Sequence, residues 1–228
     1  MEFLNLKEDL HINEKLEKIW YERYFMESEP IAPLYQEKIL KNQITFLSLN
    51  PSLLPKDREN ATRGFYPHPP FILDCFKEKA EYVFFQKFYD LGKKLNQSWA
   101  MLDLLYERDS TQENLERKYN PKVIVEKDKK FIQGQIQLTF EILKKLNPKV
   151  VVVSNAGVDK FIHWNLKELN IIQEFPNEKN SFVYKLNNIP FITNESRFMG
   201  SRQHWIRSEN DGRRNKLINE ILRVTEII

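Results

Sequence analysis

The residues of this chain best suited to chemistry are short polar side chains that come where apolar segments end. In chain order they are Ser48 and Asn50, Asp103, Ser154 and Asn155, and then Thr193, Asn194 and Ser196. If the apolar segments are parallel strands, these side chains meet at the carboxyl edge of one sheet, where open α/β proteins bind their ligands. Because Asn, Ser and Asp also favour turns, each position taken alone can equally be a plain turn. Taken together, they predict a pocket lined with amide and hydroxyl groups.

Asp103 is the polar residue that a turn explains least well. The apolar run that starts at Trp99 continues beyond it through Leu104 and Leu105. A carboxylate within a buried segment costs free energy unless it is paired or hydrogen-bonded. We therefore expect Asp103 to have either a partner or a function.

An aromatic segment follows the first of these polar positions. Residues 64–68 read Gly-Phe-Tyr-Pro-His and come after the polar loop 55–63. Phe65 and Tyr66 would add an aromatic wall to the pocket. His68 can line it too, although packing against the neighbouring prolines explains His68 better.

The spacing of apolar residues predicts the elements that position these groups. Uninterrupted apolar runs predict buried strands, and apolar residues three and four apart predict amphipathic helices. The expected strands are residues 44–49, 99–105, 150–153, 182–186 and 189–193. The expected helices are residues 6–24, 34–40, 83–95, 128–146, 158–166 and 212–227, with Asp128 capping the fourth. We expect the charged stretch 107–122 to be an exposed loop or insertion.

Strands that alternate with helices predict an α/β fold with a mostly parallel sheet and helices on both faces. At 228 residues the chain is long enough to bury one good core, so a single domain, 1–228, is expected. Within it, residues 1–41 are expected to form a helical cap and residues 42–228 the α/β core.

Composition and missing motifs exclude several classes of protein. The single Cys75 excludes an intramolecular disulfide framework and a cysteine zinc site. The four histidines are scattered, and no glycine-rich phosphate loop, nucleophile elbow or dinucleotide fingerprint is present, so we expect no metal and no cofactor. No apolar run reaches the roughly 20 residues of a membrane span. The N-terminus does not resemble a signal peptide, and we expect a monomeric, cytoplasmic protein.

Four segments resemble, in order, motifs of the uracil-DNA glycosylase superfamily. Residues 48–52, Ser-Leu-Asn-Pro-Ser, resemble the Gly-x-Asn-Pro-Gly motif of its mismatch-specific and single-strand-selective members. Residues 64–69 are similar to the Gly-Phe-Pro-Phe-type segment that follows there, and residues 144–156 to the helix, Lys-Pro turn and core strand. Residues 193–197, Thr-Asn-Glu-Ser-Arg, are similar to the Asn-Pro-Ser-Gly form of the last motif. The resemblance implies a three-layer α/β/α fold around a mostly parallel, four-stranded sheet.

The resemblance also implies roles for the polar and aromatic residues. The reaction would be hydrolysis of the N-glycosidic bond of a damaged or deaminated base that is flipped into the pocket. Asn50 would orient the hydrolytic water or steady the sugar, and Asn194 would donate a hydrogen bond to the departing base. The residues that would bind the base are Ser48, Phe65, Tyr66, Asp103 and Ser196.

Contacts to single- or double-stranded DNA would lie around the last motif. Phe198 or Met199 would be the apolar wedge that fills the gap in the base stack. The basic residues that bracket the motif are Arg197, Arg202, Arg207, Arg213, Arg214 and Lys216. Such residues can bind phosphates, and Trp205 among them favours nucleic acid over a plain solvated face. The net charge of +3 is too small to indicate a nucleic-acid partner by itself.

Departures from the family pattern bear on the target base. Ser48 and Ser52 stand where the family has glycines, and Glu195 stands where it has proline. Asp103 falls where many members carry a base-reading Asn. Because an ionised carboxylate only accepts hydrogen bonds, a base edge richer in donors than uracil fits it better. A protonated Asp103, with its pKa raised by burial, would restore the missing donor.

Two other functions stay open. A nucleic-acid-binding module of the same fold without catalysis would explain the lost glycines, whereas the retained Asn50 and Asn194 oppose it. A hydrolase or transferase acting on free nucleosides would not need the basic residues between 197 and 216. Insensitivity of its activity to salt would identify such an enzyme.

Overall fold

A six-stranded sheet with four parallel strands forms the centre of the fold. The computed structural model describes residues 2–25, 31–51, 71–73, 83–109, 111–165, 173–176, 182–186, 189–193, 199 and 202–226. The parallel strands are β6 (Trp99–Asp103), β4 (Ile44–Ser48), β7 (Val150–Val153) and β10 (Ile189–Ile192), in this order across the sheet. Strands β9 (Phe182–Leu186) and β8 (Gln173–Pro176) extend it in antiparallel pairing. The expected parallel sheet of four strands is therefore present within a wider, mixed sheet.

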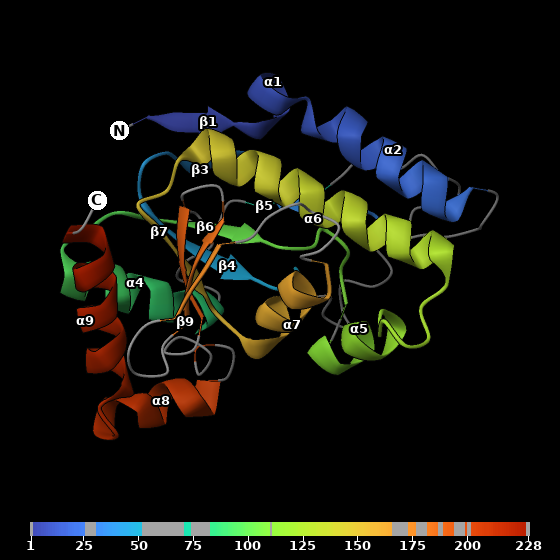
Figure 1. The fold of residues 1–228 in the computed structure, drawn as a ribbon. Coiled ribbons are helices and arrows are strands. Elements are labelled where there is room, and N and C mark those ends of the chain that lie inside the picture. Colours follow the sequence, from blue (N-terminus) through green and yellow to red (C-terminus); the bar gives the residue numbers. More distant parts are fainter. Residues whose placement is uncertain are drawn as a thin grey trace.

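Helices cover both faces of this sheet (Figure 1). On one face α4 (Val83–Leu95) and α9 (Arg213–Glu226) share a hydrophobic cluster with Phe46, Met101 and Val152. On the other face α6 (Glu126–Leu146) shares a cluster with the alternate residues Leu47, Leu102 and Val153. Helix α2 (Ile12–Tyr24) packs on α6, and Trp20 of α2 lies edge-on to Phe131 of α6 with ring centroids 4.8 Å apart. The predicted three-layer α/β/α fold is confirmed.

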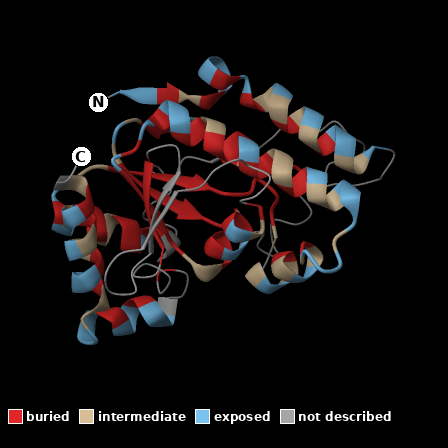
Figure 2. Cartoon of the chain, in the orientation of Figure 1, coloured by how far each residue is buried: buried red, intermediate tan, exposed pale blue. Residues whose placement is uncertain are grey.

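Burial explains why the strands are apolar along their whole length. Every residue of β4, β6 and β7 is buried, because each strand has helices above and below it (Figure 2). Strands covered on both faces have no solvent side, so they lose the alternation of polar and apolar residues. The apolar runs 44–49 and 150–153 therefore predicted their strands well.

The long helix α6 ends where the sequence predicted but begins slightly earlier. Asn147 ends it in the left-handed conformation, with φ 47°, and its N–H donates to the carbonyl of Leu143. The N-terminal cap is Val125, not Asp128. Asp128 lies in the first turn and forms an ion pair with Arg23 of α2, so its charge binds α2 to α6.

The segment 34–40 was predicted to be a helix, and this prediction is wrong. It forms two short strands, β2 (Leu34–Gln36) and β3 (Lys38–Leu40). Strand β2 pairs with β5 (Phe71–Leu73), and β3 pairs with β1 (Phe3–Asn5). Partners distant in the sequence thus satisfy the backbone of these seven residues, which have too little length for a stable helix of their own.

The first helix is also interrupted. His11, with φ 49° and ψ 48°, separates α1 (Leu6–Leu10) from α2. The side chain of Asn5 caps α1 by accepting from the N–H groups of Lys7 and Glu8. The two helices therefore change direction while both keep their leucines buried.

The charged stretch 107–122 is not a plain exposed loop. Residues 112–118 form α5 (Gln112–Lys118), which Thr111 caps, and Glu107 and Arg108 are buried. The strands β1, β5 and β8 were not predicted, and neither was the helix α8 (Arg202–Asn210) before α9. The helix α7 (Ala156–Asn165) follows β7 as expected.

Candidate functional site at the carboxyl edge of the sheet

The strand order places a topological switch point between β4 and β7. From β4 the chain passes through α4 to β6 on one side, and from β7 it passes through α7 to strands on the other side. Connections that leave two neighbouring parallel strands in opposite directions open a crevice at their carboxyl ends, and ligands bind there in open α/β sheets. The residues that end β4 and β7 therefore lie where a ligand is expected.

Three polar side chains form a row across this edge. Ser48 of β4 is in register with Asp103 of β6, and Ser154 follows β7 on the other side of β4. The Oγ atoms of Ser48 and Ser154 lie 3.1 Å apart, within hydrogen-bond distance. Because side chains alternate along strands, all three continue the rows of Phe46, Met101 and Val152 and face the α4 side of the sheet. We call Ser48, Asp103 and Ser154 the edge row.

Asp103 is the unusual member of the edge row. Its side chain is only 6% exposed, and its Oδ1 atom accepts no hydrogen bond from the residues that the structure describes. Loss of solvation by burial raises the pKa of this carboxyl to about 7. The backbone nearby is well held, since the Thr139 hydroxyl lies 3.2 Å from the carbonyl of Asp103 and 3.0 Å from that of Leu104. The residue is thus fixed in place with an oxygen that has no described protein partner.

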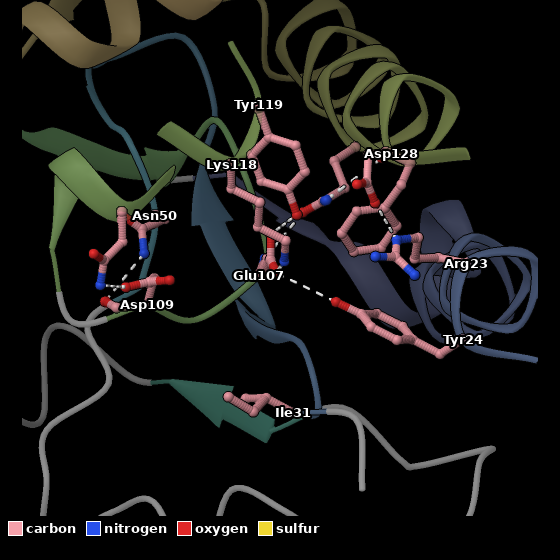
Figure 3. Close-up of polar contacts among 12 residues, drawn as sticks. Arg23, Tyr24, Ile31, Asn50, Glu107, Asp109, Lys118, Tyr119 and Asp128 are labelled. Atoms are coloured by element: carbon pink, nitrogen blue, oxygen red, sulfur yellow. Dashed lines mark hydrogen bonds and ion pairs between the residues drawn. The ribbon is translucent and has the colours of Figure 1, made fainter. Parts of the chain in front are cut away.

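Asn50 lies two residues after the end of β4, in a half-buried position. Its Nδ2 group donates to the carbonyl of Pro51 at 3.0 Å and to that of Asp109 at 3.4 Å (Figure 3). These contacts use the amide nitrogen and leave Oδ1 as the atom that can accept a hydrogen bond from a water molecule or a ligand.

The loop after β6 contains Asp109, whose carbonyl binds the side chain of Asn50. Helix α6 anchors this loop. Gln135 Oε1 accepts hydrogen bonds from the N–H groups of Tyr106 at 2.8 Å and Glu107 at 2.9 Å. The N–H groups of Leu104 and Leu105 continue the pairing with the chain after β4. A fully buried amide thus fixes the backbone that carries the site.

Glu107 joins the same loop to two other segments, α2 and the end of α5 (Figure 3). The hydroxyl of Tyr24 donates to its carboxylate at 3.3 Å, and Tyr119 and Lys118 also bond to it. The nearby carboxylate and burial raise the pKa of Tyr119 well above its usual value, burial being the larger cause. The sequence does not indicate this cluster, because the many charges of residues 107–122 predicted an exposed loop.

The chain after β7 is ordered by its own cap. The N–H of Ser154 donates to the carbonyl of Leu47 at 2.9 Å, which extends the pairing of β7 with β4. Asn155 Oδ1 accepts from the N–H of Val158 at 3.0 Å and so caps α7. Thr193, at the end of β10, is buried and on the opposite face from the edge row by strand alternation. Among the predicted strand-end residues, Asn155 therefore has a structural role.

The segment that was expected to contact DNA is only partly exposed. Met199, an expected wedge, is fully buried, and the ammonium of Lys87 from α4 donates to its carbonyl. Burial lowers the pKa of Lys87 to about 7. Trp205 is buried as well, with the guanidinium of Arg214 3.8 Å from its ring centroid. Trp205 thus cannot stack on bases in this conformation, because it packs inside the protein.

The basic residues of α8 and α9 divide into two groups. Arg214 is buried and bonds to Ser208 and to the carbonyl of Trp205. Arg207 and Lys216 are exposed. Several expected site residues lie outside the described part of the chain, and with them the side chain of Arg202. They are Phe65, Tyr66, Asn194, Ser196, Arg197 and Phe198.

A cavity of about 590 Å³ lies at the opposite edge of the sheet. Its walls include Phe3 of β1, Tyr89 of α4 and Trp99, the first residue of β6. It is at the amino ends of the strands, where α/β sheets do not place their ligands. The carboxyl edge therefore remains the candidate site.

The described residues include no group of three His, Cys, Asp or Glu side chains that could hold a metal ion. In the same part of the chain, no helix is long and apolar enough to cross a membrane. Comparison of the sequence with models of known protein families and with curated proteins finds no match.

Proposed function

We propose that this protein is a metal-independent DNA glycosylase of the cytoplasm, which hydrolyses the bond between a flipped base and its sugar. The observation that carries the proposal is the edge row, Ser48, Asp103 and Ser154, beside Asn50 at the switch point of the sheet. The order of the sequence motifs that resemble the uracil-DNA glycosylase superfamily supports the same assignment.

In this proposal Asn50 acts on the water molecule. Its Nδ2 group donates to two backbone carbonyls, and these bonds fix the orientation of the amide. Its Oδ1 atom can therefore accept a hydrogen bond from a water molecule in one fixed direction. Hydrolysis needs a water held against the sugar carbon while positive charge develops there. A fixed amide oxygen can orient that water and stabilise the developing charge.

The edge row would receive the polar edge of the base. Ser48 and Ser154 offer hydroxyl groups that can donate or accept, and Asp103 offers an oxygen without a described partner. A flipped base loses its Watson–Crick partner, and a pocket must replace those hydrogen bonds. The buried row supplies polar groups for that purpose in an otherwise apolar environment.

The exposed Arg207 and Lys216 support contact with a phosphate backbone. The burial of Trp205 and Arg214 removes two residues that the sequence had favoured for this contact. That burial is an observation in favour of the rival function, a hydrolase acting on free nucleosides, which needs fewer exposed cations.

Base release from a panel of short DNA molecules tests the proposal. Single strands and duplexes would carry uracil, hypoxanthine, xanthine or an alkylated base, and free nucleosides would be tested beside them. Release from DNA that weakens with added salt is the expected result. Release from nucleosides alone, without salt dependence, would identify the rival enzyme. Salt-sensitive DNA binding without release of any base would identify a binding module.

A further inference from the structure

The Asp103 carboxyl is a buried acid without an ion-pair partner among the described residues. Its Oδ1 has no hydrogen-bond partner among the described residues, although the side chain is buried. The other two members of the edge row bond to each other, because the Oγ atoms of Ser48 and Ser154 lie 3.1 Å apart. A buried polar atom without a partner is costly unless it serves a ligand or a function.

Four titratable groups on the described elements around Asp103 are engaged elsewhere. On the same face, Lys87 of α4 donates to the Met199 carbonyl, and Arg214 of α9 bonds within α8. On the other face, Glu141 of α6 forms an ion pair with Lys15 at 2.5 Å. Tyr106, in the loop after β6, lies 3.1 Å from the Thr139 hydroxyl, and burial raises its pKa above the usual range. Loss of solvation by burial is the cause that raises the pKa of Asp103.

We propose that Asp103 determines the specificity of this site, and that its protonation state decides which edge of a planar nitrogen base is accepted. The inference rests on the proposed function in one respect, which is that the ligand of the edge row is a base. It goes further by naming the edges and by making the choice depend on pH.

The two states of the carboxyl present different hydrogen-bond patterns. Protonated, it offers one O–H donor and one acceptor, which pair with the N–H and C=O of a lactam edge such as that of hypoxanthine. Ionised, it offers two acceptors, which pair with adjacent N–H and NH₂ donors such as those of guanine. An ionised carboxylate facing a lactam leaves one acceptor against another, and the pairing is lost.

The expected size of the effect follows from the titration. With a pKa of about 7, the protonated fraction falls from about nine-tenths at pH 6 to about one-tenth at pH 8. Affinity for a lactam edge should therefore fall about tenfold over this range. Guanine has a lactam edge and a two-donor edge, so it can pair with either state and should change far less.

Equilibrium binding of deoxyinosine and deoxyguanosine tests the proposal, because these nucleosides differ only in the 2-amino group. The full chain would be titrated with each nucleoside at pH 6 and pH 8. We expect deoxyinosine to weaken about tenfold and deoxyguanosine to stay within about twofold. The Asp103→Asn variant should bind deoxyinosine equally at both pH values, because its carboxamide donates and accepts without titrating. Asp90→Asn, a matched change on α4, should keep the pH dependence of the unchanged protein.

Parallel pH dependence for the two nucleosides would overturn the proposal. A tenfold change that persists in Asp103→Asn, or failure of both nucleosides to bind, would overturn it too. Each of these results is distinguishable from failure of the proposed function, because base release from DNA tests that function separately. Binding controlled by Asp103 without release would leave the specificity inference intact and remove the glycosylase. Release that is indifferent to Asp103 would do the reverse.

Discussion

Replacing Asp103 by Asn should make the protein more stable at neutral and alkaline pH. The side chain is buried, its Oδ1 has no described partner, and burial raises the pKa of the carboxyl from 3.8 to about 7. Ionisation in the folded state therefore costs free energy, and no ion pair among the described residues offsets this cost. The amide of Asn has nearly the same shape and carries no charge, so the substitution removes this cost.

The sign and size of the effect follow from proton binding. Because the folded pKa of Asp103 is raised, the folded chain binds more protons than the unfolded chain between pH 3.8 and about 7. The free energy of unfolding must then fall as the pH rises through this window. Two pH units separate pH 5 from the folded pKa, and each is worth about 1.4 kcal/mol. Asp103 alone should thus lower the free energy of unfolding by about 3 kcal/mol between pH 5 and pH 8.

Urea unfolding at pH 5, 6, 7 and 8 measures this directly. The difference between Asp103→Asn and the unchanged protein should grow with pH by about 3 kcal/mol, because all other groups titrate alike in both. Asp90→Asn, which replaces a carboxyl that accepts a bond from Gln86 on the surface of α4, is the matched control. That control should follow the unchanged protein at every pH. A constant difference between Asp103→Asn and the unchanged protein would refute the reasoning, since it would mean that Asp103 is ionised and satisfied in the fold.

Three further predictions concern the supports of the site and its surface. Gln135→Leu removes the acceptor of two backbone N–H groups and should lower the free energy of unfolding, measured in urea, by about 2–4 kcal/mol. A loss below about 1 kcal/mol would show that water replaces the amide. Gly92→Ala places a Cβ 2.6 Å from Trp99 Cδ1 and should cost about 1–3 kcal/mol by the same assay, and an unchanged stability would contradict the close packing of α4 on β6. Arg207→Ala should reduce the steepness of log affinity for a short duplex against log salt concentration by about 1. Fluorescence anisotropy measures this slope, and an unchanged slope would exclude Arg207 from phosphate contact.

The sheet could be predicted because its signal is local. Residues 44–49 and 150–153 are apolar without interruption, a pattern typical of strands covered on both faces. Helices α4 and α6 could be predicted from apolar residues three and four apart. Parallel strands then had to place their carboxyl ends at one edge, and this brought Ser48, Asp103 and Ser154 together.

The errors lie where distant partners decide the structure. Residues 34–40 are strands because β1 and β5 pair with them, and neither partner can be recognised from the seven residues themselves. Glu107 is buried because Tyr24, Lys118 and Tyr119 surround it, although its charge and its charged neighbours suggested exposure. Side-chain contacts between segments so far apart cannot be derived from spacing along one chain.

The site shows the same division between local and distant information. The sequence singled out Asp103 because a carboxylate interrupts an apolar run. It could not show that Asn50 is held by Asp109, or that Gln135 fixes the loop between them. Trp205 and Arg214 were expected at the surface, but both are buried, with the guanidinium of Arg214 over the ring of Trp205.

Whether this protein is a glycosylase can be measured as single-turnover release of a base from DNA, compared between the unchanged protein and Asn50→Ala. The substrates would be duplexes and single strands that carry uracil or hypoxanthine, and Asn120→Ala, in the loop after α5, would be the matched control. We expect release by the unchanged protein and by the control, with a loss of about a hundredfold or more in Asn50→Ala. Equal release by all three proteins would contradict the role of Asn50, and release by none of them would contradict the glycosylase itself.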